Sequence, residues 1–329
     1  MDALPEFSDI EAARARIAAH AVRTPLVENA ELNARAGRRV LLKLESLQRT
    51  GSFQFRGACN LVGELAAAEP GRPVVAYSSG NHAQGVAAAA ALCGLAATIV
   101  MPADAPAIKR ERTARHGATI VPYDRLSEDR EAIARRIAAE QRAAIVPPYD
   151  HRLIIAGQGT AGLELVEDAE TFGVELSQVL VPTSGGGLAA GIALALAESA
   201  PEARLYTVEP AGFDDLARSL QSGRRERNKA AGGSICDALM SQTPGEMTFE
   251  INRRRLAGGL VVGDEEVCAA MRFAFQELKL VLEPSGAVGL AALLTGKVPD
   301  ESGALAVVLT SGNVEPGLFA AILAGEGSS

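Results

Sequence analysis

Glycines and small polar residues gather in a turn at 183–187, directly after an apolar run at 179–182. Consecutive glycines let several backbone N–H groups point inward, and a helix starting near residue 188 adds positive potential. The turn could therefore cradle a phosphate, although its spacing is neither that of a P-loop nor GxGxxG. The alternative is a tight turn without a ligand. The residues of this candidate anion site are Ser184, Gly185, Gly186, Gly187 and Leu188.

A second candidate turn, Ser79-Gly80-Asn81-His82, stands between an expected strand and an alanine-rich helix. Its hydroxyl, carboxamide and free helix-end N–H groups suit a carboxylate or a phenolate-like oxygen. The simpler alternative is that Ser79 or Asn81 only caps the helix.

Two other polar groups have plainer interpretations. Thr310 follows the last expected strand, where its hydroxyl could meet a ring nitrogen or serve as a cap. Glu209 and Asp215 could hold a hard cation together with backbone carbonyls, but acidic residues also favour a helix N-terminus. The histidines lack metal-ligand spacing, and no GxSxG elbow of a serine hydrolase occurs.

The elements that must position these turns alternate between short apolar runs and helical patterns along most of the chain. This alternation predicts an α/β fold of two doubly wound parallel-sheet domains, covered by helices on both faces. Turns of this kind bind ligands at the carboxyl ends of the strands. We expect a large domain of residues 1–50 with 149–329 and a small domain of residues 51–148, with boundaries uncertain by about 20 residues.

The composition excludes several function classes. Of the 329 residues, 48% are hydrophobic and 22% charged, as in an ordinary globular protein. The net charge of −8 and the lack of a basic stripe argue against nucleic-acid and anionic-membrane partners. No apolar run approaches the ~20 residues of a spanning helix, and the N-terminus has no signal-peptide core. The four scattered cysteines predict a reducing cytoplasm.

The stretch at 43–53, Lys-Leu-Glu-Ser-Leu-Gln-Arg-Thr-Gly-Ser-Phe, resembles the approach to the cofactor lysine in threonine/serine dehydratases and serine racemases. These are pyridoxal-phosphate enzymes of the tryptophan synthase β type, also called fold type II. The turns at 79–82 and 184–188 resemble the asparagine and phosphate loops of that family. Supporting stretches lie in family order over roughly residues 8–315, at 23–26, 101–102, 157–160, 208–210, 283–287 and 310–313.

The resemblance implies a role for each candidate residue. Phe53 would stack on the pyridine ring, Asn81 would bond the 3-hydroxyl, and Thr310 would face the ring nitrogen, with Glu283 as a further cofactor-binding residue. The loop at 184–188 would hold the phosphate. Ser52 and the turn at 79–82 would take the substrate carboxylate, and Ser79 could also act as a second acid or base. A Mg²⁺ or other divalent cation would bind Glu209, Asp215 and the Phe213 carbonyl.

Gln54 is the main departure from the family pattern, because it stands where the resemblance places the Schiff-base lysine. An amide nitrogen is neither nucleophilic nor basic, so Gln54 cannot bind the cofactor covalently or remove the Cα proton. Lys43, the one lysine near it in the sequence, lies about eleven residues back on the preceding strand and is a poor substitute. Gln54 is either a substitution made to trap bound substrate, which the intact cofactor residues favour, or natural in a protein without turnover.

The resemblance implies an ammonia-lyase (dehydratase) that converts a 3-hydroxy amino acid, such as threonine or serine, to a 2-oxo acid and ammonia. With Gln54 the present form should be inactive or impaired. One alternative is a serine racemase or 3-hydroxyaspartate dehydratase that uses Ser79. An alternative of another class is a non-catalytic protein that binds pyridoxal phosphate or an amino acid. Family members are commonly dimers, so we also expect a homodimer.

Overall fold

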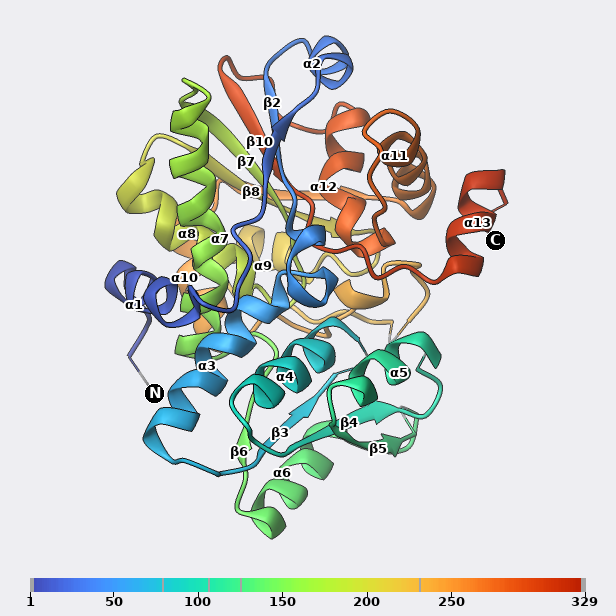
Figure 1. Cartoon of the computed structure of the whole chain (residues 1–329). Coiled ribbons are helices and arrows are strands. Elements are labelled where there is room, and N and C mark those ends of the chain that lie inside the picture. The colour runs from blue at the N-terminus through green and yellow to red at the C-terminus, as the bar shows by residue number, and fades with distance from the viewer. Residues whose placement is uncertain (1–2, 79, 106, 125, 231, 327–329) are drawn as a thin grey trace.

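The computed structural model describes residues 3–78, 80–105, 107–124, 126–230 and 232–326. Its strands form two sheets (Figure 1). The larger sheet has six strands in the order β1-β2-β10-β7-β8-β9, and the smaller has four in the order β5-β4-β3-β6. Every pairing is parallel except that between β1 and β2. The strands are β1 (Leu26–Glu28), β2 (Val40–Lys43), β3 (Val74–Tyr77), β4 (Ala97–Pro102), β5 (Thr119–Tyr123), β6 (Ala144–Ile145), β7 (Leu176–Pro182), β8 (Arg204–Pro210), β9 (Gly258–Val262) and β10 (Ala304–Val308).

Helices connect these strands, as the predicted alternation requires. They are α1 (Phe7–Ile17), α2 (Ala30–Ala36), α3 (Gln54–Ala68), α4 (Asn81–Leu92), α5 (Ala107–Arg115), α6 (Arg130–Gln141), α7 (Arg152–Thr171), α8 (Gly187–Ser199), α9 (Asp215–Ser222), α10 (Glu246–Arg255), α11 (Asp264–Gln276), α12 (Pro284–Leu294) and α13 (Pro316–Ala324), with 3₁₀ turns η1 (Glu45–Leu47), η2 (Arg49–Gly51) and η3 (Asp237–Leu239). In the described part of the chain no helix is long and apolar enough to cross a membrane.

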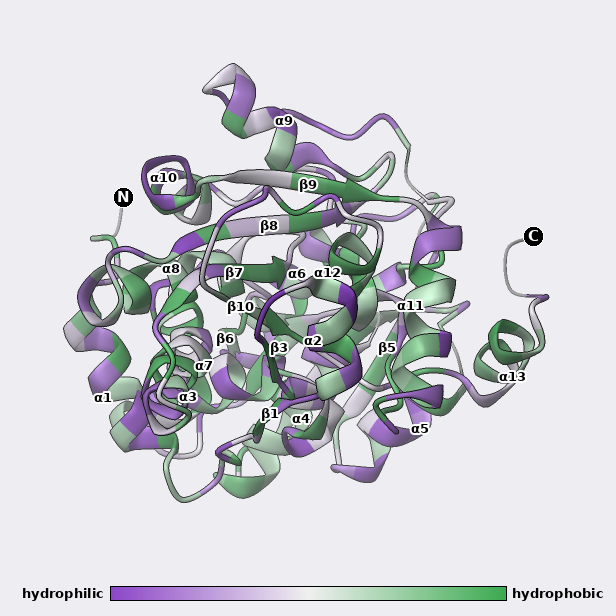
Figure 2. Cartoon of the chain, turned by 90° about the horizontal axis from the view of Figure 1, so that it is seen from above, coloured by the Kyte–Doolittle hydropathy of each residue, from purple (hydrophilic) through white to green (hydrophobic). Residues whose placement is uncertain are grey.

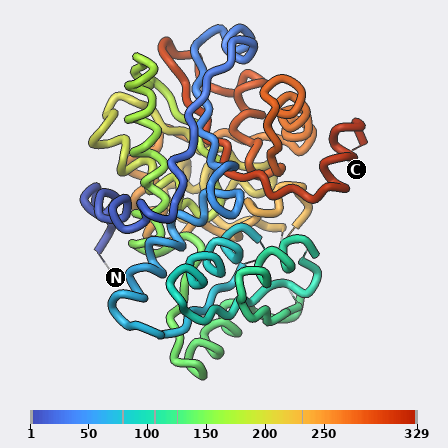
Figure 3. The backbone as a smooth tube through the Cα atoms, viewed as in Figure 1, coloured from blue at the N-terminus to red at the C-terminus, as the bar shows by residue number. Residues whose placement is uncertain are grey.

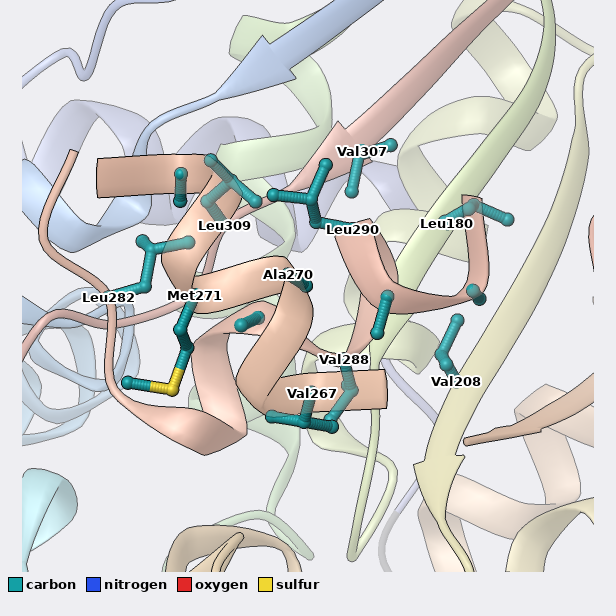
Figure 4. Close-up of a cluster of buried hydrophobic side chains, with 14 of the residues drawn as sticks. Leu180, Val208, Val267, Ala270, Met271, Leu282, Val288, Leu290, Val307 and Leu309 are labelled. Atoms are coloured by element: carbon teal, nitrogen blue, oxygen red, sulfur yellow. The ribbon is translucent and has the colours of Figure 1, made fainter. Parts of the chain in front are cut away.

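Both sheets are buried on both faces, because successive strand residues point to opposite sides. In the large sheet, Leu180 and Val307 pack toward α11 and α12 (Figure 4), whereas Val179 and Val308 pack toward α7 and α8. In the small sheet, α3 and α4 cover one face and α6 covers the other. Seen from above, the interior strands β3, β7 and β10 are largely apolar (Figure 2). The predicted fold class is therefore confirmed.

The chain enters the large sheet, leaves it for the small sheet and then returns (Figure 3). As expected, the N-terminal strands join the larger sheet, which is otherwise built from the second half of the chain. Strand β2 pairs with β10, and Lys43 lies opposite Val308. All strands of the small sheet fall within 74–145. The division into domains at residues 50 and 149 stays a prediction. Two strands, β1 and β9, are not predicted by the sequence. The first has only three residues, too few to show a pattern. The second begins with a glycine pair at 258–259 that is typical of a turn.

Candidate active site

A cavity of about 150 Å³ lies between the two sheets, where β3, β7 and β10 give way to the turns that follow them. This is the position at which open α/β sheets bind ligands. The cavity brings together predicted site residues from both parts of the chain: Phe53, Gln54, Gly80, Asn81, His82, Ser184, Gly185, Gly186, Gly187, Leu188 and Thr310. The three turns identified in the sequence therefore converge. Ser79, the predicted second acid or base, lies outside the described residues.

The glycine loop is held from behind by α10. Thr248 donates its hydroxyl to the Gly185 carbonyl at 2.6 Å, and the Asn252 amide donates to the Gly186 carbonyl at 3.1 Å. Gly186 has a φ of 93°, a conformation that glycine adopts at no steric cost. With its carbonyls bound on one side, the loop can turn its N–H groups to the other. Among the described residues, no partner accepts from the N–H of Ser184, Gly185 or Gly186.

Side chains fill the space beside this loop so closely that only glycine fits. A Cβ atom on Gly185 would lie 2.3 Å from the ring of Tyr149, and one on Gly187 would lie 2.6 Å from the Gln158 Oε1. That Gln158 oxygen is buried without a hydrogen-bond partner in the described structure. A glycine cradle with free donors at the start of α8 is the arrangement that binds a phosphate.

The Asn81 side chain has a fixed orientation. Its Oδ1 accepts from the Asn313 amide at 2.8 Å, and its Nδ2 donates to the buried carboxylate of Glu283. Asn313 is itself held by Arg112, which donates to its Oδ1 at 2.7 Å. An amide nitrogen carries two N–H groups, so one N–H of Asn81 remains for the oxygen of a ligand. Burial raises the pKa of Glu283.

Backbone contacts join the loop before α3 to the end of β10. The Phe53 N–H donates to the Thr310 carbonyl at 3.1 Å, and Ser52 forms an isolated bridge with Ser311. Phe53 and Thr310 both line the cavity. Ser52 is fully buried, and its hydroxyl has no partner among the described groups. An aromatic ring, a hydroxyl and the Asn81 amide thus lie around one space.

Gln54 is the first residue of α3, and it lines the cavity. Its Oε1 is buried without a hydrogen-bond partner in the described part of the molecule. An unsatisfied buried acceptor costs about 1–3 kcal/mol. A side chain at this position is therefore aimed into the cavity without being used by the protein itself.

Lys43 cannot reach this cavity, because its ammonium is bound elsewhere. Its Nζ donates to the Thr24 carbonyl at 2.7 Å and to the carboxylates of Glu164 at 2.9 Å and Asp168 at 3.2 Å. The side chain is fully buried. These contacts agree with the expectation that Lys43 is a poor substitute for the missing amine.

Lys109 and Arg130 are two cavity cations that the sequence does not predict. Lys109 lies on α5 and lines the cavity, and its Nζ contacts the Asp237 carboxylate at 2.5 Å. Arg130, the first residue of α6, also lines the cavity. In the sequence, α5 is a charged helix without a turn motif, and charged helices are typical of solvated surfaces. Only the approach of α5 to η3 reveals the role of Lys109 as a cavity cation.

His82 is neutral in this environment. Its Nε2 lies 3.0 Å from the Val146 carbonyl, and its Nδ1 is buried without a partner in the described structure. Burial lowers the pKa of His82 to about 4. A neutral imidazole can donate or accept a hydrogen bond, but it does not supply a positive charge to an anionic ligand.

Glu209 and Asp215 lie outside this cavity. The Glu209 carboxylate accepts from the N–H groups of Leu216 and Ala217 at 3.0 and 2.7 Å, at the start of α9. Asp215 accepts from Asn228 with one oxygen, and its Oδ2 is buried without a partner among the described residues. Burial, followed by the charge of Asp215, raises the pKa of Glu209. No cluster of three or more His, Cys, Asp or Glu side chains suited to a metal occurs in the described ranges.

Comparisons with known proteins agree with this geometry. The family model described as "Pyridoxal-phosphate dependent enzyme" matches residues 17–312. L-threo-3-hydroxyaspartate ammonia-lyase of Pseudomonas sp is 42% identical over 98% of this chain and 99% of its own length. The solved threonine deaminase of T.th. superposes with a TM-score of 0.89 at 42% identity, covering 94% of this chain and 99% of its own. Maize serine racemase gives a TM-score of 0.90 at 36% identity, covering 96% and 95% of the two chains.

Proposed function

The chain belongs to the family of pyridoxal-phosphate-dependent enzymes, and from this we propose that it is an ammonia-lyase of 3-hydroxy amino acids whose present form is impaired by Gln54. Its relatives include ammonia-lyases for 3-hydroxyaspartate and threonine, and serine racemases. One observation carries the proposal: the glycine loop, the Asn81 amide and Phe53 surround a single cavity into which Gln54 also projects.

The cavity residues fit the cofactor of the family. When bound, pyridoxal phosphate supplies an aldehyde that condenses with an amino group and a ring that withdraws electrons from Cα. The free N–H groups of 184–186 would hold its phosphate, and the spare N–H of Asn81 would bond its ring oxygen. Phe53 would stack on the ring, and the Thr310 hydroxyl would meet the ring nitrogen without forcing it to protonate.

Gln54 limits what this chain can do to a bound amino acid. We propose that it occupies the place of the lysine that would hold the cofactor and move the Cα proton. Its carboxamide cannot accept that proton at neutral pH. Its unpartnered Oε1 supports the view that the surroundings suit a group with a different bonding capacity, because they leave the amide oxygen unsatisfied.

The experiment that tests the proposal restores an amine. Gln54→Lys, with saturating pyridoxal phosphate, should raise 2-oxo acid release from a 3-hydroxy amino acid by about 10²–10⁴-fold and should give the protein a visible absorption band. Gln54→Met is the matched control, because it has a similar length and no amine. Threonine, serine and 3-hydroxyaspartate should be compared as substrates.

Two other outcomes favour the alternatives. If Gln54→Lys binds the cofactor but releases no 2-oxo acid from any of these substrates, the chain is a binding protein for pyridoxal phosphate or an amino acid. If it converts L-serine to D-serine, and Ser79→Ala abolishes only that conversion, the chain is a racemase. The 3-hydroxyaspartate candidate is favoured over threonine by the cavity cations Lys109 and Arg130, since a dicarboxylic substrate brings an additional negative charge.

A divalent cation at Glu209, Asp215 and the Phe213 carbonyl is a separate part of the proposal. The unpartnered Asp215 Oδ2 supports it, since a buried carboxylate oxygen needs a proton or a cation. Mg²⁺ should raise the thermal midpoint of this chain but not that of Glu209→Gln. If the thermal midpoint of the unchanged chain is the same with and without Mg²⁺, the chain has no cation site at these residues.

The proposal also includes a homodimer in the cytoplasm. None of the four cysteines forms a disulfide in the described structure, as a reducing compartment favours. Sedimentation of the purified chain tests the dimer.

A further inference from the structure

Lys109 and Asp237 form an ion pair that crosses the cavity between the two parts of the chain. Lys109 extends from α5, beside the small sheet, and Asp237 opens η3, which follows β8 of the large sheet. The Lys109 Nζ lies 2.5 Å from an Asp237 carboxylate oxygen. Both residues line the cavity. The pair therefore stands where a ligand has to lie.

The Lys109 side chain packs along the turn expected to receive the substrate carboxylate. A Cβ atom on Gly80 would lie 3.1 Å from the Lys109 Cδ and 3.3 Å from its Nζ. Because Gly80 has no side chain, the ammonium can lie directly against the start of α4. A ligand bound at that turn would have a second position for an anionic group, the Lys109 ammonium, within reach.

Lys109 acts as a cation and not as a substitute for the missing amine. Burial alone would lower its pKa, but Asp237 and Glu283 outweigh burial and raise the pKa above its ordinary value. A protonated amine has no lone pair with which to attack an aldehyde. At neutral pH the group therefore offers positive charge and three N–H donors to the cavity.

The two members of the pair differ in exposure, and this difference suggests which one a ligand displaces. The Lys109 side chain is 6% exposed, whereas that of Asp237 is 38% exposed. Asp237 can return to water at little cost if another carboxylate takes its place. Lys109 cannot leave without abandoning a buried charge, which is costly. The ammonium is the fixed half of the pair, and the Asp237 carboxylate is its exchangeable counterion.

We propose that Lys109 makes the site selective for acidic amino acids: the side-chain carboxylate of the substrate displaces Asp237 and binds the Lys109 ammonium. This assignment rests on the proposed function, because it assumes an amino acid in this cavity. Asp237 is then the group that keeps the cation neutralised until an acidic ligand arrives. A neutral ligand such as threonine gains nothing from the exchange.

The test compares L-aspartate with L-asparagine, which have nearly the same shape and differ in one negative charge. Neither carries a β-hydroxyl, so neither can be dehydrated. Calorimetry on the chain with saturating pyridoxal phosphate therefore measures binding without elimination, and condensation with the cofactor aldehyde is common to both ligands. The chain should prefer aspartate. Lys109→Met should reduce the aspartate preference by about 10–100-fold, the range for a hydrogen bond to a charged group, with asparagine binding unchanged. Lys297→Met is the matched control, because its ion pair with Glu266 lies outside the cavity.

Asp237→Asn gives an independent result that does not require Lys109 to be changed. Removing the competing carboxylate should tighten aspartate binding several-fold and leave asparagine binding unchanged. Unchanged aspartate binding in this variant would overturn the proposal, whether or not Lys109→Met folds. The proposal is also overturned if Arg130→Met, and not Lys109→Met, removes the preference for aspartate.

Failure of the proposed function gives a different pattern. If Gln54→Lys releases no 2-oxo acid but the aspartate preference depends on Lys109, the chain is a binder of acidic amino acids and the role of Lys109 stands. If 2-oxo acid is released but the acid-to-amide preference does not respond to Lys109 or Asp237, the ion pair is only structural. The two proposals therefore fail separately.

Discussion

Two clusters of buried polar side chains lie two residues apart at the start of α3, one around Arg56 and one around Gln54. Arg56 is fully buried and binds two carboxylates: Glu45 at 2.8 Å and Glu164 at 2.7–2.8 Å. Lys43 adds its own three contacts to the same cluster. Every donor of these two cations is matched by an oxygen. This cluster is complete without any ligand.

The cluster around Gln54, in contrast, contains buried polar atoms without hydrogen-bond partners in the described structure. The Oε1 atoms of Gln54 and Gln158 are buried without hydrogen-bond partners in the described ranges, as is the Ser52 hydroxyl. The N–H groups of the glycine loop also lack acceptors there. Buried polar groups normally have hydrogen-bond partners. The polar residues around Arg56 therefore stabilise the fold, whereas those around Gln54 are available to bind a ligand. The same residue types serve both purposes.

The largest expected effect on stability comes from a substitution in the cluster around Arg56. Arg56→Met should lower the free energy of unfolding by about 3–5 kcal/mol, because Glu45 and Glu164 would remain buried without their cation. Denaturation in urea measures the loss. The control is Arg14→Gln, which removes an ion pair with Glu167 whose side chains are 45% and 37% exposed, and which should leave stability almost unchanged. Equal effects of the two changes would contradict the comparison.

The second effect concerns His82, whose pKa is lowered to about 4 by burial. The unfolded chain, with an ordinary histidine pKa near 6.5, binds a proton at a higher pH than the folded chain does. The contribution of neutral His82 is therefore complete above about pH 6.5 and is lost as the pH falls toward 4. By pH 4 the loss should reach about 3 kcal/mol. His82→Gln should show a correspondingly shallower decline in denaturation midpoint between pH 7 and pH 4, and parallel declines would refute a buried neutral His82.

The smallest effect compares one substitution in the two kinds of environment. Gln54→Met should raise the free energy of unfolding by about 1 kcal/mol, because it removes an unsatisfied buried oxygen. Gln48→Met should instead lower it by about 1–3 kcal/mol. Both ends of the Gln48 amide are bound: its Oε1 accepts from the N–H groups of Val22 and Arg49, and its Nε2 donates to the Val22 carbonyl. If both substitutions change the free energy of unfolding in the same direction, Gln54 and Gln48 do not differ in hydrogen bonding as proposed.

Much of the site could be predicted because its parts follow local rules. A strand, a glycine or hydroxyl turn and a helix start appear in that order along the sequence, and parallel sheets bring such turns to one edge. Lys109 could not be found this way, because its place depends on the approach of α5 to η3 across a sequence separation of 128. The glycine pair at the start of β9 pairs with Tyr206 and Thr207 only because the sheet supplies a neighbour. Local patterns carry no information about such long-range partners.

The placement of β10 has a consequence for how this protein is made on the ribosome. β10 lies between β2 and β7, near the middle of the large sheet, yet it is the last strand to be synthesised. The strands of the small sheet are complete once residue 145 has emerged, so that unit can fold while translation continues. Strand β2 pairs with β10, which is made more than 250 residues later. A nascent chain stopped before residue 304 would therefore expose an unpaired strand on each side of the gap.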